Sequence, residues 1–218
     1  MTLRRMILLL DNYDSFVHNL ARYFRQAGRT TRVIRSDAID LQGIRALAPS
    51  AIVLSPGPKG PESAGCCVDV ARCLSDRVPV LGICLGHQAI LAAFGAQISP
   101  SAPAHGIDDQ IHHNGSRLFQ GCPSPMTVGR YHSLSVVRES IPDEFRVTSQ
   151  TDDGIVMSIE HCDRPLYGVQ FHPESVLTEF GGRLIENFVA ITDEFSSVGD
   201  LRQPCGCDAS SGHWMQTP

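Results

Sequence analysis

The sequence predicts an α/β protein with an open, mostly parallel β-sheet, helices on both faces of that sheet and a few additional antiparallel strands. Two patterns carry this prediction. Between residues 6 and 95, short apolar runs alternate with segments of helical spacing, and only a few residues connect them, as in a parallel sheet covered on both faces. After residue 95 the pattern changes, and segments that resemble strands are separated by turns.

The first part of the chain is predicted to alternate between strand and helix. The apolar runs predict buried strands at residues 6–10, 31–34, 51–54 and 78–83. Helical spacing predicts helices at residues 15–26, 39–47, 62–74 and 87–94. Asp14 or Ser15 is expected to cap the first of these helices, and Gly28 is expected to end it.

The second part is predicted to be mainly extended and to close with one helix. The expected strands lie at residues 96–99, 126–130, 135–137, 145–148, 155–159 and 166–169, and an amphipathic helix is expected at residues 179–191. We therefore expect one domain over residues 1–192. Residues 193–218 are polar and without periodicity, which predicts a flexible tail. Cys205, Cys207 and His213 in this tail fall short of a metal site.

Composition excludes several classes of protein. Eighteen Lys and Arg residues against 23 Asp and Glu residues leave a net charge of −5, so the basic surface of a nucleic-acid-binding protein is absent. No segment approaches the roughly 20 apolar residues of a membrane span, so we expect no membrane association. The eight cysteines are scattered and follow no signal peptide, which favours reduced thiols in a cytoplasmic protein.

Candidate functional segments follow several of the predicted strands. They are Asp-Asn-Tyr-Asp-Ser (11–15), Ser-Pro-Gly-Pro (55–58) and Cys-Leu-Gly-His-Gln (84–88). Because ligands bind beyond the carboxyl ends of parallel strands, we look for chemistry in these segments. Asp11, Asn12 and Asp14 are open to two interpretations: they close a strand and cap a helix, or, beside the candidate site, they contact a partner or line the path of a product.

The strongest local signal is the segment Gly82-Ile83-Cys84-Leu85-Gly86, between a predicted strand and a predicted helix. It has the layout G-x-S-x-G of a nucleophile elbow, with cysteine in place of serine. A helix N-terminus favours the thiolate of Cys84, and the backbone N–H of Leu85 could hold an oxyanion. The alternative interpretation is a buried thiol at a glycine-rich turn.

Two further segments could complete such a site. Extended backbone near residues 168–175 would place His172 and Glu174 on the same side, where the carboxylate can orient the imidazole. Gly57 lets its backbone N–H approach a ligand, which suits a second oxyanion donor. Taken alone, each segment favours a structural interpretation, as a satisfied histidine or a plain turn.

Together these segments resemble the class I (triad) glutamine amidotransferases, whose fold is flavodoxin-like. The motifs that carry the resemblance are LLLDNYDSF (8–16), LSPGPKGPESAG (54–65), GICLGHQ (82–88), RYHSL (130–134) and GVQFHPES (168–175). The resemblance covers residue 6 to about residue 192. More narrowly, DNYDSF and RYHSL are similar to the glutaminase subunits of two chorismate-aminating synthases, anthranilate synthase and aminodeoxychorismate synthase.

The resemblance implies hydrolysis of glutamine to glutamate and ammonia, without a cofactor and without a metal. By matched position, Cys84 would attack the side-chain amide of glutamine, and His172, oriented by Glu174, would transfer protons. The N–H groups of Gly57 and Leu85 would hold the oxyanion.

Substrate and partner also follow from the resemblance. Gln88 and the main chain at Ser133 and Leu134 would bind glutamine, and a larger synthase subunit would use the ammonia to aminate chorismate. We favour the glutaminase subunit of anthranilate synthase, with that of aminodeoxychorismate (p-aminobenzoate) synthase as the alternative. Further alternatives are a stand-alone cysteine γ-glutamyl hydrolase and a non-catalytic binding subunit.

Several segments depart from the family pattern. After His105-Gly106 the family usually has Lys or Arg, then Thr and Ser, whereas this chain has Ile107-Asp108-Asp109. We expect this segment to be a loop that faces the partner, so the change bears on docking rather than on the triad. Lys59-Gly60-Pro61 and Gly182 are interpreted as tolerated surface changes, and His112-His113 as exposed loop residues.

Overall fold

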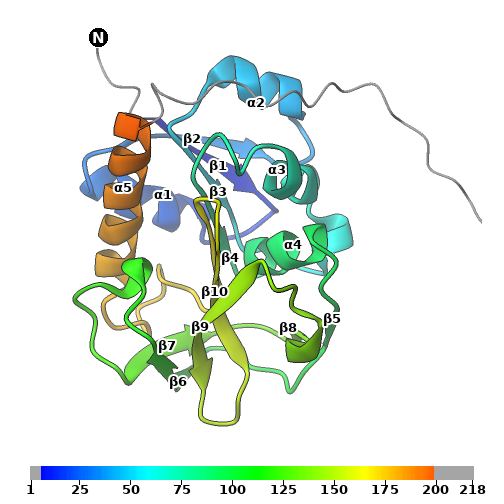
Figure 1. The fold of residues 1–218 in the computed structure, drawn as a ribbon, viewed down its shortest axis with the longest axis vertical. Helices are drawn as coiled ribbons and strands as arrows, with labels where there is room; N and C mark the ends of the chain where they lie inside the picture. Colours follow the sequence, from blue (N-terminus) through cyan, green and yellow to red (C-terminus); the bar gives the residue numbers. More distant parts are fainter. Residues whose placement is uncertain (1–5, 199–218) are drawn as a thin grey trace, which may run out of the picture.

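The computed structural model describes residues 6–198, and its centre is a nine-stranded mixed sheet (Figure 1). Five neighbouring strands run parallel in the order β2-β1-β3-β4-β11. Their bounds are β1 (Met6–Asp11), β2 (Thr30–Arg35), β3 (Ala51–Leu54), β4 (Val80–Ile83) and β11 (Leu166–Val169). Apart from the edge strand β2, these strands are almost wholly buried, as their unbroken apolar sequences predict.

The rest of the sheet is antiparallel. Its strands follow β11 in the order β10 (Val156–His161), β9 (Phe145–Thr151), β6 (Ile107–His113) and β7 (Met126–Arg130). A separate two-stranded sheet pairs β5 (Ile98–Pro100) with β8 (Leu134–Val136). The predicted fold class is therefore confirmed, with the antiparallel strands added at one side of the parallel sheet.

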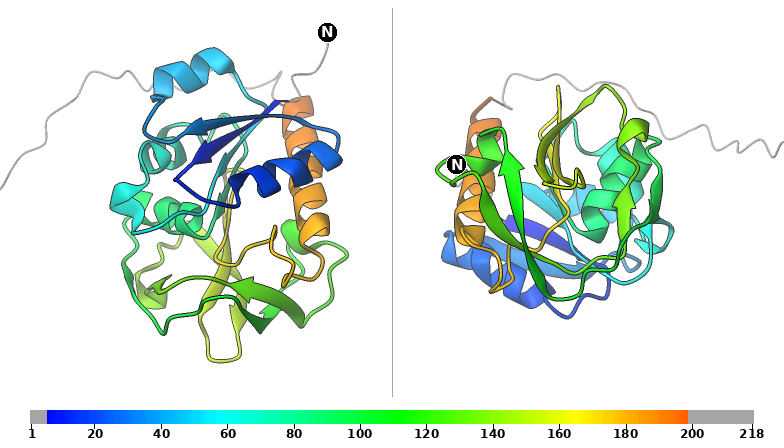
Figure 2. Two further views of the ribbon diagram at one scale, coloured as in Figure 1. Left: turned by 180° about the vertical axis from the view of Figure 1, so that it is seen from behind. Right: turned by 90° about the horizontal axis from the view of Figure 1, so that it is seen from below.

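Helices cover both faces of the parallel strands (Figures 1 and 2). One layer consists of α1 (Val17–Gln26) and α5 (Gly181–Val198), and the other of α2 (Leu41–Leu47), α3 (Cys67–Cys73) and α4 (Leu85–Ala93). The alternation of side chains along β1 builds both layers: Ile7 and Leu9 belong to the core under α1 and α5, whereas Leu8 and Leu10 belong to the core under the other three helices.

The first helix begins later than the sequence predicts. α1 begins at Val17, and its N-cap residue Phe16 makes no side-chain cap hydrogen bond, so the expected caps Asp14 and Ser15 are wrong. The reason is a turn in which Tyr13 has a positive φ of 62° and the Asp14 N–H donates to Oδ1 of Asp11.

The helix expected at residues 62–74 is divided. A 3-10 turn over Pro61–Ser63 is followed by α3, and further 3-10 turns lie at Arg117–Phe119 and Arg138–Ser140. Gly65 separates the first turn from α3 because its φ is +53° and because a β-carbon there would lie 2.5 Å from the backbone of Ser36.

The strand β6 is absent from the sequence prediction, which treated residues 107–109 and His112-His113 as loop. The segment instead pairs with β7 on one side and β9 on the other. Ile111 is its only fully buried residue, so the hydrophobic signal of a strand is missing from the sequence. His112 lies near Asp152, with Nε2 2.8 Å from Oδ1, and His113 stacks on Phe119.

The last helix, α5, continues past residue 192, where the domain was expected to end. Residues 193–198, expected in the tail, are helical, and Asp193 and Glu194 form ion pairs with Arg29 and Arg117. The remainder of the expected tail, including Cys205, Cys207 and His213, lies outside the described residues.

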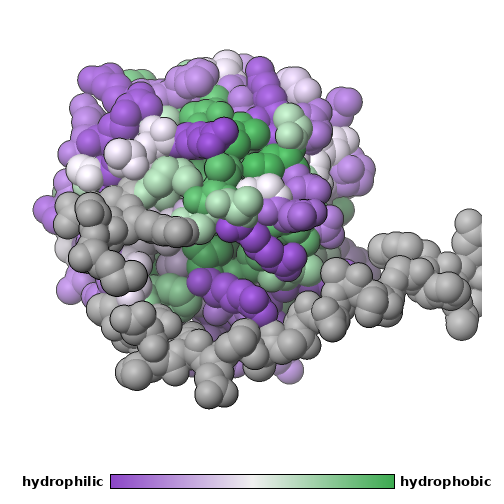
Figure 3. All heavy atoms as spheres, turned by 90° about the horizontal axis from the view of Figure 1, so that it is seen from above, coloured by the Kyte–Doolittle hydropathy of each residue, from purple (hydrophilic) through white to green (hydrophobic). Residues whose placement is uncertain are grey.

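Figure 3 shows the face at the amino-terminal ends of the parallel strands, where apolar residues (green) lie among hydrophilic ones (purple). This face is at the opposite end of the sheet from the candidate functional segments. None of the helices within residues 6–198 is long and apolar enough to cross a bilayer.

Candidate active site

Neighbouring strands bring the candidate segments together at the carboxyl end of the parallel sheet. β3, β4 and β11 are adjacent, and the segments that follow them carry Gly57, Cys84 and His172. The backbone N–H of Cys84 donates a hydrogen bond of 2.8 Å to the carbonyl of Val169, which joins the end of β4 to the end of β11. Strand adjacency therefore places Cys84 and His172, far apart in sequence, in one site.

Cys84 lies at a strained turn between β4 and α4. Its φ of 51° and ψ of −103° cost a non-glycine residue on the order of 1–3 kcal/mol. The flanking glycines make the turn possible: a β-carbon at Gly82 would lie 2.4 Å from the carbonyl oxygen of Gly86, and one at Gly86 would lie 2.2 Å from that of Leu54. Because α4 begins at Leu85, the thiol lies at a helix N-terminus. The geometry is that of a nucleophile elbow.

His172 and Glu174 form a buried pair in which Nδ1 of the imidazole is 2.7 Å from Oε1 of the carboxylate. Burial by itself would lower the pKa of His172, but the neighbouring Cys84 sulfur and the Glu174 carboxylate outweigh it and raise that pKa above its usual range. Nε2 of His172 has no hydrogen-bond partner among the described residues. This nitrogen is therefore available for proton transfer.

The strand β7 holds the segment that carries His172. The His172 N–H donates to the carbonyl of Gly129 at 3.1 Å, and the Gly129 N–H donates to Oγ1 of Thr178 at 2.9 Å. The Thr178 hydroxyl in turn donates to the His172 carbonyl at 2.6 Å. The antiparallel part of the sheet therefore positions the imidazole.

A cavity of about 140 Å³ lies beside Cys84. It is lined by six of the residues proposed from the sequence, namely Gly57, Cys84, Leu85, Gln88, Ser133 and Leu134. His172 and Glu174 line a neighbouring cavity of about 110 Å³, and Tyr131 borders both. The cavities together provide a place for a small substrate on the thiol side and access to the imidazole on the other.

Two buried glutamines connect the cavity wall to the thiol. Nε2 of Gln88 donates to the Leu134 carbonyl at 3.0 Å and to Oε1 of Gln170 at 3.1 Å. Nε2 of Gln170 donates to Sγ of Cys84 at 3.6 Å. Oε1 of Gln88 has no hydrogen-bond partner among residues 6–198, so it can accept a hydrogen bond from a ligand.

Sequence reasoning missed Gln170 and Tyr131. Both lie inside motifs that were noticed, GVQFHPES and RYHSL, but only other members of these motifs were singled out. The Tyr131 ring packs edge-on against the ring of His172, with 4.9 Å between centroids, and its hydroxyl lies 3.1 Å from Oγ of Ser175. Tyr131 therefore limits the movement of the imidazole.

Asn12 supports the loop of Gly57. Its side-chain amide donates to the Ser55 carbonyl at 2.9 Å, and its backbone N–H donates to Oγ of Ser55 at 2.9 Å. A β-carbon at Gly57 would lie 2.4 Å from the carbonyl oxygen of Asn12, so glycine is required for this approach. Asn12 thus supports the loop of Gly57 and does not cap α1.

Asp11 and Asp14 have structural contacts in the same turn. Asp11 pairs with Arg35 at 2.7 Å and accepts the hydrogen bond from Asp14 described above. Burial raises the pKa of Asp14 to about 6, and the nearby charge of Glu174 contributes in the same direction. Oδ2 of Asp14 is buried without a hydrogen-bond partner among the described residues.

The described cysteines are all free thiols. Burial raises the pKa of Cys66 to about 11 and that of Cys67 to about 12, which makes both poor nucleophiles. Cys84, by contrast, lies at the elbow, at the N-terminus of α4 and on the cavity. Across residues 6–198, no cluster of three or more His, Cys, Asp or Glu residues could hold a metal ion.

Known proteins are similar to this chain over most of its length. The family model described as glutamine amidotransferase class-I matches residues 8–192. Anthranilate synthase component II of Haloarcula marismortui is 48% identical over 187 residues, which cover 84% of this chain and 96% of that protein. Aminodeoxychorismate synthase component 2 of Escherichia coli is 49% identical over 185 residues, which cover 84% of this chain and 99% of that protein.

Other matches extend the comparison. The bifunctional protein TrpGD of Thermotoga maritima is 45% identical over 192 residues, but the matching part is only 33% of its length. The crystal structure of a protein described as a GMP synthase subunit from Thermoplasma acidophilum superposes with a TM-score of 0.82 at 27% identity, covering 92% of this chain and all of that one.

Proposed function

The chain belongs to the class I glutamine amidotransferase family, and from this premise we propose that Cys84, His172 and Glu174 hydrolyse the side-chain amide of glutamine to glutamate and ammonia. The observation that carries the proposal is the elbow at Cys84, which opens on the cavity beside the buried His172–Glu174 pair. Each residue has a role that its contacts support.

In the first step, the thiolate of Cys84 attacks the amide carbon of glutamine and forms a tetrahedral oxyanion. The oxyanion collapses when the C–N bond breaks, and the departing nitrogen takes a proton from Nε2 of His172. The raised pKa of His172 supports this role, because it keeps the imidazole protonated at neutral pH until the leaving group needs the proton.

In the second step, neutral His172 removes a proton from water, which attacks the γ-glutamyl thioester and releases glutamate and the Cys84 thiolate. Glu174 holds Nδ1 throughout, so that Nε2 remains the nitrogen that gives and takes the proton. The net reaction consumes one water for each glutamine and yields one ammonia.

We assign the oxyanion site to the backbone N–H groups of Gly57 and Leu85. Both residues line the cavity with Cys84, one from the loop after β3 and one from the first turn of α4. Donors that are held by rigid elements stabilise the developing charge without reorganising. Asn12 and the close packing at Gly57 supply that rigidity on one side.

We assign glutamine recognition to Gln88 and to the main chain at Ser133 and Leu134. These residues form part of the wall of the cavity that Gly57 and Cys84 also line. The unpartnered Oε1 of Gln88 suits the α-ammonium group of glutamine, since an ammonium offers only donors.

We propose that the ammonia passes to a larger synthase subunit that aminates chorismate. The names of the two relatives with nearly full coverage, a component II and a component 2, support a partner of this kind. We retain anthranilate synthase as the favoured assignment and aminodeoxychorismate synthase as the alternative, which the identities of 48% and 49% support equally. A cytoplasmic location is proposed with this biosynthetic role.

The test is release of glutamate from glutamine by the full chain, alone and with the large subunit of each of the two synthases. We expect hydrolysis that Cys84→Ala abolishes and that Cys73→Ala, at an exposed cysteine, leaves unchanged. Stimulation by only one large subunit would assign the pathway. Hydrolysis that survives Cys84→Ala would contradict the mechanism, and full turnover without either subunit would favour a stand-alone hydrolase.

A further inference from the structure

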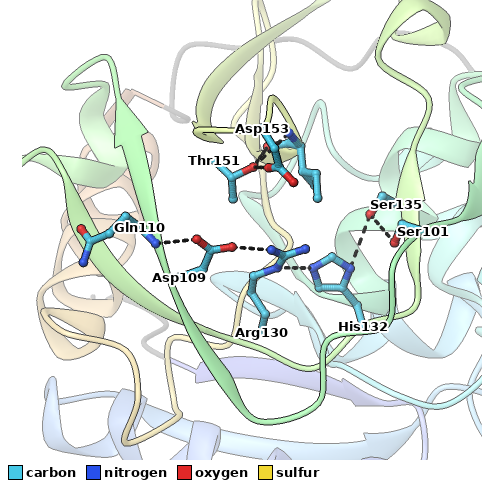
Figure 4. Close-up of polar contacts among 9 residues, drawn as sticks. Ser101, Asp109, Gln110, Arg130, His132, Ser135, Thr151 and Asp153 are labelled. Carbon is cyan, nitrogen blue, oxygen red and sulfur yellow. Dashed lines mark hydrogen bonds and ion pairs between the residues drawn. The ribbon is translucent and has the colours of Figure 1, made fainter.

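A line of polar contacts joins strand β6 to the wall of the cavity beside Cys84 (Figure 4). It runs from Asp109 through Arg130 to His132, and from there to Leu134 and Ser135. The line begins at Asp109, in a segment that was expected to be a loop and is part of strand β6. It therefore connects this strand with the proposed glutamine site.

The position of Asp109 follows from the geometry of β6. Asp109 and Ile111 lie on the inner side of the strand, whereas Asp108 and Gln110 are exposed on the other side. In the antiparallel register, Ile107 is opposite Arg130, so Asp109 is the diagonal neighbour of that arginine. Asp109 pairs with the guanidinium of Arg130, which is almost completely buried.

Arg130 in turn determines how His132 is hydrogen-bonded. Nε of Arg130 lies 3.3 Å from Nε2 of His132, and an arginine can only donate, so Nε2 must accept. Nδ1 then carries the proton and donates to the Leu134 carbonyl at 3.0 Å. Burial, together with the positive charge of Arg130, lowers the pKa of His132 to about 4, which keeps the imidazole neutral as this arrangement requires.

The contacts of His132 reach the cavity directly. His132, Ser133 and Leu134 all line it, and the Leu134 carbonyl accepts from both His132 and Gln88. Oγ of Ser135 lies 3.4 Å from Nδ1 of His132 and donates to Oγ of Ser101. This bond connects the wall to the loop that follows β5. His132 thus helps to hold the Leu134 carbonyl, to which the amide of Gln88 also donates.

We propose that Asp109 and Arg130 are positioning residues for glutamine binding, because they fix His132 and, through it, the wall formed by Gln88, Ser133 and Leu134. This inference rests on the proposed function, since it assigns the wall to glutamine. Neither residue contacts the triad in the described structure, so their removal should weaken substrate binding and leave the reactivity of Cys84 intact.

The experiment compares Asp109→Asn with Asp108→Asn. Both variants remove one carboxylate from the same strand, but Asp108 is on the exposed side. The full chain is treated with 6-diazo-5-oxo-L-norleucine, a glutamine analogue with a diazoketone in place of the amide, and alkylation of Cys84 is followed by mass spectrometry. The alkylation rate is measured over a range of analogue concentrations. Its dependence on concentration gives the dissociation constant of the analogue and, separately, the alkylation rate at saturation. Iodoacetamide, which lacks the amino-acid portion, reports the reactivity of the thiol alone.

For Asp109→Asn we expect the dissociation constant of the analogue to rise by roughly fivefold to twentyfold, while the saturated rate and the iodoacetamide rate stay within about twofold. Asp108→Asn should match the wild type in all three quantities. Arg130→Lys is the second variant: lysine keeps a charge opposite Asp109 but has no planar Nε–H for His132, so it should also weaken binding.

Two results would overturn the inference. Unchanged analogue binding in folded Asp109→Asn and Arg130→Lys would show that the wall does not need these residues. An equal loss of iodoacetamide reactivity would show a general structural role instead. By contrast, wild-type Cys84 that reacts with iodoacetamide but never with the glutamine analogue would contradict the proposed function itself, and this inference with it.

Discussion

Gly86 lies directly against Leu54, so that a β-carbon at position 86 would come within 2.2 Å of the Leu54 carbonyl oxygen. The contact sets the first turn of α4 on the end of β3, and with it the distance between Cys84 and the loop that carries Gly57. The two oxyanion donors proposed above lie on either side of this contact. A glycine here is therefore a requirement of both the fold and the site.

Gly86→Ala should destabilise the protein. The added methyl group has no space and must push α4 away from β3, which we expect to cost about 2–3 kcal/mol of unfolding free energy. Urea denaturation measures the change. The matched control is Gly182→Ala in α5, where a β-carbon would be 3.7 Å from the Tyr23 ring; this variant should be neutral or stabilising by up to about 1 kcal/mol. Equal stability of the two variants would contradict the packing described at Gly86.

Glu174→Gln should lower kcat for glutamine hydrolysis by about 100-fold and leave KM nearly unchanged. The neutral amide of Gln at position 174 has no negative charge to stabilise the protonated imidazole of His172. It also accepts the Nδ1–H hydrogen bond less strongly than the carboxylate does. Initial rates of glutamate release over a range of glutamine concentrations separate the two constants. Glu179→Gln, at an exposed carboxylate nearby in the chain, should behave as the wild type. A large rise in KM alone would place Glu174 in substrate binding.

Asp14→Asn should stabilise the folded protein at neutral pH. The pKa of Asp14 is about 6 in the folded state, above the value of 3.8 expected in the unfolded state. Between these two values the folded protein keeps a proton on Asp14 that the unfolded chain releases. The free energy of unfolding of the wild type therefore falls as the pH rises from about 4 to about 6. Asparagine avoids the loss, and after allowance for partial exposure we expect a gain of about 1 kcal/mol above pH 6.

The measurement for Asp14 is the free energy of unfolding of variant and wild type between pH 4 and pH 8. The difference in unfolding free energy between Asp14→Asn and the wild type should be smallest at pH 4. At that pH, Asp14 of the wild type is most fully protonated in both the folded and the unfolded state, and the difference should grow toward pH 6. Asp108→Asn is the control, because that carboxylate is exposed, and its difference from the wild type should not follow the same curve. A pH-independent effect of Asp14→Asn would show that its charge is not the cause.

Tyr131 should act through its ring. The ring packs against His172, whereas the hydroxyl contacts only Ser175 within the described structure. We expect Tyr131→Phe to keep kcat within about threefold and Tyr131→Ala to lower it by roughly tenfold, because the imidazole loses its packing partner. Steady-state assays of both variants provide the measurement. An equal loss in the two variants would assign the effect to the hydroxyl.

Much of the fold could be predicted because the parallel strands are buried on both faces. Unbroken apolar runs such as residues 7–10 carry a strong signal, and β1 lies where it was expected. The polar strand β6 carries no such signal, since its stability comes from pairing with β7 and β9 rather than from its own side chains. The turn before α1 was missed because local backbone conformation at Tyr13, and not a cap residue, decides where that helix begins.

The site shows a similar division. The elbow at Cys84 could be predicted locally, because glycines at 82 and 86 are needed by a turn that involves nearby residues. The approach of His172 to Cys84 depends on the pairing of β4 with β11, which no spacing in the sequence reveals. Gln170 and the line from Asp109 to His132 required the packed structure, since their contacts join separate elements. The catalytic roles themselves stay predictions until the variants are measured.

The register between β4 and β11 has a consequence for how the chain can change over evolution. The spacing of the proposed nucleophile and base is set where Val80 to Ile83 pair with Leu166 to Val169, whereas the chain between them makes a long excursion through the antiparallel strands. Turns in this excursion can gain or lose residues without altering that spacing, provided that β11 returns to the same register and β7 still holds the His172 segment. The distance between Cys84 and His172 therefore does not depend on the number of residues between them.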